Sequence, residues 1–223
     1  MKKICLLILI FYFISVSNSL AATNEKLVAA IPEKGVYLYA IDDKVLNMFS
    51  HFHLIMNGKE IRPKDWFNIT KAGFPPNLTL KDLNHDGNNE LIVVLAKNEE
   101  SGVYVTEGHV IEDRNGRLNE AHVEDAIPVA KRTVKFQVSE STLTVTVNGN
   151  MQVIQLPKEI TETNPNYDDQ VVYQANQEGF FCNISVTLQH IHIGDISLKY
   201  GYKKNAYRVE KVIFYLRQGF ALF

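Results

Sequence analysis

The sequence has little cysteine and no excess of positive charge, and each shortage excludes a class of protein. Cys5 lies in the apolar N-terminal run, which leaves Cys182 as the only cysteine in the rest of the chain. One thiol cannot form an internal disulfide, so the fold must depend on a hydrophobic core. The 23 basic residues are outnumbered by 25 acidic residues. Nucleic acid is therefore an unfavourable partner, because phosphate binding needs clustered Lys and Arg.

The N-terminus has the three parts of a secretory signal. A basic start precedes an apolar run from Ile4 to Val16, and small residues follow it. The run is too short to cross a hydrocarbon layer of about 30 Å as a helix, and no later segment is apolar enough to do so. We predict a signal peptide at residues 1–21. The protein is then secreted or otherwise extracytoplasmic, free or associated with the cell wall, and has no membrane span once the signal is removed.

Beyond the signal, alternation with a two-residue period predicts strands rather than helices. Asn-Gly pairs at 57–58, 115–116 and 148–149 favour tight hairpins between them. A uniformly apolar segment, Leu91–Leu95, is typical of a central strand that is buried on both faces. The other predicted strands are Gly35–Ile41, Phe49–Met56, Val103–Ile111, Val134–Val138, Leu143–Val147, Met151–Leu156, Phe180–Ile193, Ile196–Tyr202 and Tyr207–Leu216.

One short helix is expected after Asp125, which can cap it, with Pro128 in the first turn where its missing amide costs nothing. Residues 22–34 have little periodicity and are expected to form a lead-in, and residues 157–169 a surface loop. The pattern predicts one mainly-β domain over residues 22–223, an antiparallel sandwich or rolled sheet with one short helix.

The segment from Asp82 to Glu90 carries the clearest chemistry. Oxygen donors alternate along it and a glycine at the sixth position allows a sharp turn. Ca²⁺ takes six to eight oxygen ligands, which a short loop supplies by turning every second residue inward. The predicted ligands are Asp82, Asn84, Asp86, the backbone carbonyl of Asn88, and Glu90. The alternative is a metal-free turn, since Asn, Asp and Gly are also ordinary turn residues.

The loop is not an EF-hand, because Val93 occupies the twelfth position, where a bidentate Glu is required. Asp82-x-Asn84-x-Asp86-Gly87-x-x-Glu90 followed by an apolar strand resembles the calcium loops of FG-GAP and VCBS-type repeats. Those repeats occur in integrin-like propellers and many secreted bacterial proteins. Here Glu90 replaces the more usual Asp, and a single copy of the motif in a chain this short argues against a complete propeller, which needs at least four blades. The wider pattern is similar to small secreted proteins of Bacillus-type bacteria that have no established activity.

Two histidine pairs offer an enzymatic alternative. His51 and His53, and likewise His190 and His192, are two residues apart in predicted strands, where they would share a face and could hold zinc with a third ligand. The alternative function is thus a secreted hydrolase or zinc-dependent enzyme. Carboxylates such as Glu99, Glu100, Glu107 and Asp113 could serve sugar hydrolysis, but no spacing singles out a pair.

Aromatic residues favour a non-catalytic function. Trp66 and the same-phase pairs Tyr37 with Tyr39 and Tyr200 with Tyr202 could form an amphipathic binding face, or could equally be packing residues of the sheet. Calcium, secretion and this aromatic content predict a binding module that contacts a polysaccharide or protein of the cell envelope. A structural component of a wall layer would instead reveal itself by self-association.

Overall fold

The computed structural model describes residues 24–101, 103–157, 160, 163–167 and 170–217. The predicted signal peptide lies outside the described residues and stays a prediction. The elements, in chain order, are β1 (Glu25–Ile31), the 3-10 helix η1 (Pro32–Lys34), β2 (Val36–Asp43), β3 (Met48–Met56), β4 (Lys59–Ile61), β5 (Asn68–Ile69), β6 (Asn77–Lys81), β7 (Glu90–Glu100), β8 (Val103–Arg114), β9 (Arg117–Ala121), α1 (Ala126–Thr133), β10 (Val134–Ser139), β11 (Thr142–Val147), β12 (Asn150–Gln155), β13 (Gln170–Asn176), β14 (Gly179–Leu188), β15 (Ile191–Lys203) and β16 (Ala206–Leu216).

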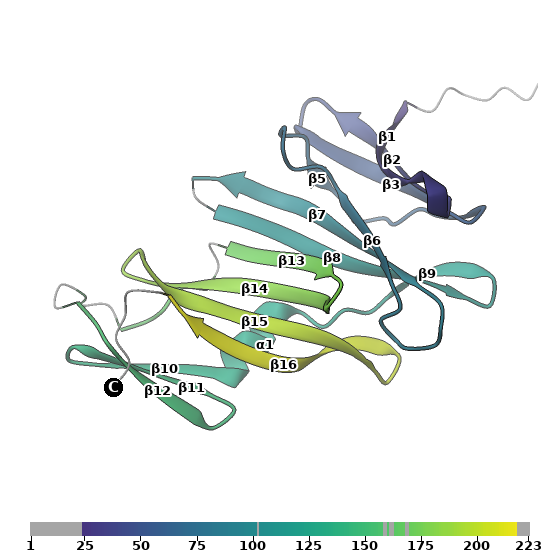
Figure 1. Ribbon diagram of the computed structural model, residues 1–223. Helices are drawn as coiled ribbons and strands as arrows, with labels where there is room; N and C mark the ends of the chain where they lie inside the picture. Colours follow the sequence, from purple (N-terminus) through teal and green to yellow (C-terminus); the bar gives the residue numbers. More distant parts are fainter. Residues whose placement is uncertain (1–23, 102, 158–159, 161–162, 168–169, 218–223) are drawn as a thin grey trace, which may run out of the picture.

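The strands form three sheets, which confirms the predicted mainly-β class with one short α-helix among the described residues (Figure 1). The largest sheet has eight strands in the order β16-β15-β14-β13-β8-β7-β6, with β9 paired to β8. A five-stranded sheet contains β1 to β5, and a three-stranded meander contains β10 to β12. Pairing between named strands is antiparallel except between β13 and β8.

The eight-stranded sheet has a separate core on each face, and β7 contributes to both. Leu91, Val93 and Leu95 belong to the core shared with the five-stranded sheet. Ile92 and Val94 belong to the core shared with α1 and the β10–β12 meander. Successive strand residues point to opposite faces, so a strand between two cores must be apolar at every position. The uniformly apolar prediction for this segment is confirmed.

Local signals specified the hairpins and the helix. Asn57, Asn115 and Asn148 have φ near 50° and are followed by glycines at φ of 74° to 83°, the left-handed geometry of tight turns. Asp125 Oδ1 accepts a hydrogen bond from the Ile127 amide at 3.1 Å, as expected of an N-cap.

Three expectations about the elements were wrong or incomplete. Residues 25–31 are strand β1, which pairs with β2 despite its weak alternation. The segment predicted as a single strand from Phe180 to Ile193 is interrupted by a turn at Gln189 and His190, where φ is 50° and 64°. The sequence pattern also gave no sign of β13, which pairs antiparallel with β14 on one side and parallel with β8 on the other. Only the β13–β8 pairing joins strands far apart in the chain, about which local pattern carries little information, whereas β1 with β2 and the β14–β15 turn involve neighbouring segments.

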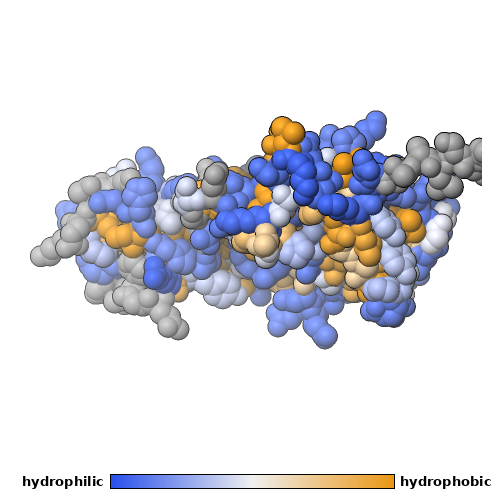
Figure 2. Space-filling model, turned by 90° about the horizontal axis from the view of Figure 1, so that it is seen from above, coloured by the Kyte–Doolittle hydropathy of each residue, from blue (hydrophilic) through white to orange (hydrophobic). Residues whose placement is uncertain are grey.

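No α-helix in the described part of the chain is long and apolar enough to span a membrane. Seen from above, hydrophilic surface surrounds several smaller hydrophobic patches (Figure 2). The large apolar side chains that are exposed among the described residues are Leu27, Val45, Leu46, Met151 and Tyr215.

Candidate metal centre

The predicted calcium loop is the connection between β6 and β7. Lys81 at the end of β6 pairs with Glu90 at the start of β7, so the ladder closes the loop at its base. Gly87 has φ 90°, and no other atom lies near the position where a Cβ would stand. The sharp turn expected at the sixth position is therefore present, in a conformation that glycine adopts without strain.

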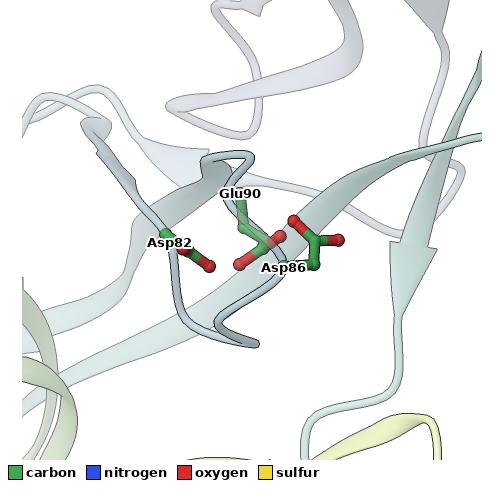
Figure 3. A group of neighbouring side chains, drawn as sticks. All are labelled: Asp82, Asp86 and Glu90. Carbon is green, nitrogen blue, oxygen red and sulfur yellow. The ribbon is translucent and has the colours of Figure 1, made fainter.

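Three carboxylates converge inside this loop. Asp82, Asp86 and Glu90 each offer an oxygen, and these oxygens all lie within 4.8 Å of one another. Figure 3 shows the three side chains projecting into the same space from the two limbs of the loop. Because oxygens this close repel when ionised, a partly buried triad of this kind can bind a metal ion.

The other two predicted ligands make hydrogen bonds to Asp86. Asn84 Oδ1 accepts from the Asp86 amide at 2.8 Å, and Asn84 Nδ2 donates to Asp86 Oδ2 at 3.1 Å. The backbone amide and Nδ2 of Asn88 both donate to Asp86 Oδ1. The hydrogen bond from the backbone amide of Asn88 is the main reason that the pKa of Asp86 is below its ordinary value. The roles of Asn84 and Asn88 as ligands stay a prediction.

Glu90 is the buried member of the triad. It is 3% exposed, and burial raises the pKa of its carboxyl even though Oε2 accepts hydrogen bonds from the amides of Leu83 and Asn84. The charges of Asp86 and Glu112 raise it further. The ionised form of Glu90 is thus disfavoured in the protein alone, and a cation beside it would oppose both causes.

Asp82 supplies an oxygen with unmet hydrogen-bonding capacity. Its Oδ2 accepts from the Gly87 amide at 3.1 Å, whereas Oδ1 is buried and has no hydrogen-bond partner among the described residues. A buried carboxylate oxygen without a donor is costly in a folded protein. Coordination of a cation would satisfy it.

The sequence pattern did not indicate the polar residues that lie near Glu90. Glu112 is 3% exposed and lies on β8, one residue beyond the Leu91–Ile111 pair that joins β8 to β7. Tyr207 Oη, from β16, donates to Glu112 Oε1 at 2.8 Å. The β7–β8 hairpin register was a usable signal for Glu112, but no local pattern indicates that β16 delivers Tyr207 to this place.

The histidine pairs do not form the predicted shared faces. His51 is exposed, has φ 51° and lies where the β2–β3 register shifts, so the two-residue period is broken between it and His53. His53 is buried, with its ring nitrogens 3.1 Å from Glu25 Oε2 and 2.9 Å from Glu60 Oε2.

The two histidines of the second pair do not lie in one strand. His190 stands in that turn, while His192 is on β15 with Nε2 3.0 Å from Asp195 Oδ1. Among the described residues, one cluster of three or more acidic, His or Cys side chains could hold a metal, and it is the triad in the loop.

The expected aromatic binding face is also corrected in part. Trp66 is 4% exposed and Tyr200 is 3% exposed, so neither ring offers a stacking surface. Tyr37, Tyr39 and Tyr202 are half-buried. The packing role of tyrosine in strands therefore accounts for Tyr200, which donates through Oη to the Glu124 carbonyl at 2.8 Å.

Fold and site together define a mainly-β protein with an acidic cluster that can bind a metal ion at one strand connection. Comparison with known proteins adds no relative: no family model, no curated protein and no solved structure matches the chain.

Proposed function

We propose that the protein is a secreted, calcium-braced β protein with a non-catalytic binding role at or outside the cell envelope. The observation that carries the proposal is the convergence of Asp82, Asp86 and Glu90 in a loop anchored to a strand that lies between both cores. The FG-GAP-like and VCBS-like pattern of the loop adds support from the sequence.

The chemistry of the ligands favours calcium over other ions. All the candidate ligand atoms are oxygens, which suit hard cations, and a loop that can also offer carbonyl and water oxygens suits the high coordination number of Ca²⁺. Extracellular calcium sites of this kind bind with a Kd of about 0.1 to 1 mM, so the ion would be retained in a calcium-rich exterior.

The binding role is supported by two clefts that use the loop as a wall. A cleft of about 680 Å³ is lined by Asn88 and Asn89 together with residues of the five-stranded sheet and its turns, such as Asn57. A smaller cleft of about 230 Å³ is lined by Asp82 and Asn84 together with residues of β15 and β16. An ion in the loop would fix the walls of both clefts.

Thermal unfolding of the protein without residues 1–21, with calcium and with chelator, tests the metal. A ligand that binds only the folded state raises its stability, so about 5 mM Ca²⁺ is expected to raise the Tm by about 2 to 9 °C. Mg²⁺ at the same concentration is expected to do less, because it demands a smaller octahedral site.

Matched variants locate the effect. Asp86→Ala removes a triad carboxylate and is expected to abolish the calcium response. Asn89→Ala changes a loop residue outside the triad and is expected to keep it. Equal calcium responses in the wild type and Asp86→Ala would refute the loop as the site.

The binding role has its own test. Co-sedimentation with purified cell-wall polysaccharide, in calcium and in chelator, is expected to retain more protein when calcium is present. A calcium-stabilised protein that stays in the supernatant in both conditions would keep the metal site and overturn the polysaccharide partner.

A further inference from the structure

Strand β16 ends the eight-stranded sheet, with β15 beside it on one side only. Near its end, Arg217 N donates to Ile193 O of β15 at 3.1 Å. Backbone groups of an antiparallel strand point alternately toward its neighbour and away from it, so those of Ile213 and Tyr215 also face β15. The residues whose N–H and C=O groups point outward, with no backbone hydrogen bond among the described residues, are Val212, Phe214 and Leu216.

The first half of the same edge is closed by the segment before α1. Tyr207 N donates to the His122 carbonyl at 2.8 Å, and the Tyr207 carbonyl accepts from Glu124 N at 2.8 Å. Two residues further on, Val209 N donates to Glu124 Oε2 at 3.0 Å. Open strand edges pair readily with other chains, and proteins usually cover them. The second half of β16 is therefore the part of this edge that can accept a further strand.

The β10–β12 meander forms a wall beside the open edge (Figure 1). A cleft of about 220 Å³ lies between β16, at Val212 and Phe214, and strands β11 and β12. On β11, Val145 is buried, whereas its cross-strand partner on β12, Gln152, is exposed although it lines the same cleft. Cross-strand partners point to the same face of a sheet. Strand β12 therefore extends past the edge of β16 and covers the space beside it.

This arrangement leaves room for one extended chain beside β16. The edge supplies N–H and C=O groups for a ladder, and β12 covers one face of the added strand. A second copy of the protein, paired through its own β16, fits poorly, because a two-fold axis would bring two meanders to the same face of the joined sheet. A single segment of another protein meets no such obstacle.

The walls restrict the side chains that the segment can carry. The cleft has no charged residue in its lining, and burying an unpaired charge there would be costly. Asn150 and Gln152 offer amide groups that can bond to a hydroxyl side chain. On the opposite face of the sheet, Ile213 and the exposed Tyr215 would lie next to the added strand and favour a β-branched or aromatic neighbour.

We propose that the open edge of β16 binds an extended, uncharged segment of a partner protein, which joins the sheet as one further strand. Backbone hydrogen bonds to Val212, Phe214 and Leu216 hold the segment, and alternate side chains enter the cleft under β12. The cleft shares no lining residue with the two clefts beside the acidic loop, so this surface is separate from the proposed calcium site.

Amide hydrogen exchange, read residue by residue in ¹⁵N–¹H spectra, tests the pairing directly. The probe is a short peptide of alternating Thr and Val with blocked ends. At a peptide concentration about ten times its Kd, exchange at Val212 and Phe214 is expected to slow about tenfold, since only the free protein exposes these amides. The amides of Ile213 and Tyr215 already bond to β15 and are internal controls that should stay slow throughout.

A control peptide has the same side chains but carries a methyl group on every backbone nitrogen. It cannot donate to a strand edge, so it is expected to leave the exchange of Val212 and Phe214 unchanged. Equal slowing by both peptides would overturn strand addition and assign the effect to adsorption on apolar surface.

Matched variants locate the segment under β12. Gln152→Trp places a large ring in the cleft and is expected to weaken binding of the Thr–Val peptide at least about tenfold. Met151→Trp changes the next residue, which points to the opposite face of β12 and is 68% exposed, and is expected to keep the affinity. Equal affinities for the two variants would overturn the placement in the cleft.

Three further results would overturn the proposal. The first is no saturable change at Val212 and Phe214 with the Thr–Val peptide. The second is exchange at these amides that is as slow as at Ile213 in dilute protein alone, which would mean that the edge is already paired. The third is slowing that grows with protein concentration in the absence of peptide, which would assign the edge to a second copy of the chain.

Discussion

The backbone amide of Leu83 lies 2.7 Å from Oε2 of Glu90, so the first residue of β7 binds back to the start of the loop that precedes it. This contact holds a carboxylate in a buried position where its own charge is poorly tolerated. Hydrogen bonds within the loop thus help to set its shape, and the electrostatic cost falls on Glu90.

Glu90→Gln separates the shape of the loop from its charge. Glutamine can still accept from the Leu83 amide but carries no charge. In chelator we expect the variant to unfold at a higher temperature than the wild type, because the disfavoured buried charge is gone. In calcium it is expected to lose the Tm increase.

Calorimetry of both proteins with and without calcium checks this. Glu60→Gln is a suitable control, since the Glu60 side chain is 69% exposed. If Glu90→Gln instead lowers the Tm in chelator, the carboxylate has a structural role that its raised pKa does not describe.

The raised pKa of Glu90 predicts how the stability of the protein changes with pH. A carboxyl whose folded-state pKa is raised binds its proton more tightly when folded, so its contribution falls as pH rises from its ordinary pKa of 4.5 through the higher folded value. The Tm difference between wild type and Glu90→Gln in chelator should grow as pH rises from about 4.5 to 7.

The stability contributed by other carboxyls changes with pH in the opposite direction. This change is the same in the wild type and in Glu90→Gln, so it cancels in the Tm difference. The pKa of Glu25 is lowered chiefly by the hydrogen bond from Arg62. Burial raises the pKa of Glu124, but the hydrogen bond from Arg132 outweighs it and the pKa is lowered. Their contribution is lost as pH falls. A Tm difference that is flat across this pH range would show that Glu90 is not the titrating group.

Cys182 is predicted to be unreactive in the folded protein. It is 0% exposed in the larger core, and burial raises the pKa of its thiol, so almost no thiolate forms near neutral pH. A disulfide-exchange reagent should modify it only as fast as the protein unfolds. Rapid labelling under native conditions would indicate that β14 opens locally.

Gly108 is predicted to be a packing glycine. A Cβ there would lie 2.6 Å from Phe180 Cζ and 2.8 Å from Tyr173 Cδ1, on the face opposite to His109. Gly108→Ala should cost about 1 to 3 kcal/mol in the free energy of unfolding, as overpacking of a rigid core does.

Gly201→Ala is the matched control for Gly108→Ala. The three atoms nearest to its added methyl all belong to the side chain of Glu210, which is flexible and can turn aside. Denaturant unfolding of both variants should show a clear loss for Gly108→Ala and a small one for Gly201→Ala. A loss for Gly108→Ala as small as the loss for Gly201→Ala would mean that the rings around Gly108 can move.

The sequence by itself determined the β class, the hairpin turns, the capped helix and the acidic triad. Each of these is encoded within a short segment: alternation sets a strand, Asn-Gly sets a turn, and the spacing of Asp82, Asp86 and Glu90 places their carboxylates inside one loop. The buried strand after the loop was also predictable, since a short segment that is apolar at every position is stable as a strand only when both of its faces are covered.

Only the tertiary structure decided which distant residues meet. A register shift in β3 and the turn at His190 separated histidines that sequence spacing had paired. The parallel pairing of β13 to β8 and the arrival of Tyr207 at Glu112 depend on strands far apart in the chain. Trp66, His109 and Glu120 likewise come together from three elements. Such contacts follow from the summed burial of whole sheets, and no short segment carries that information.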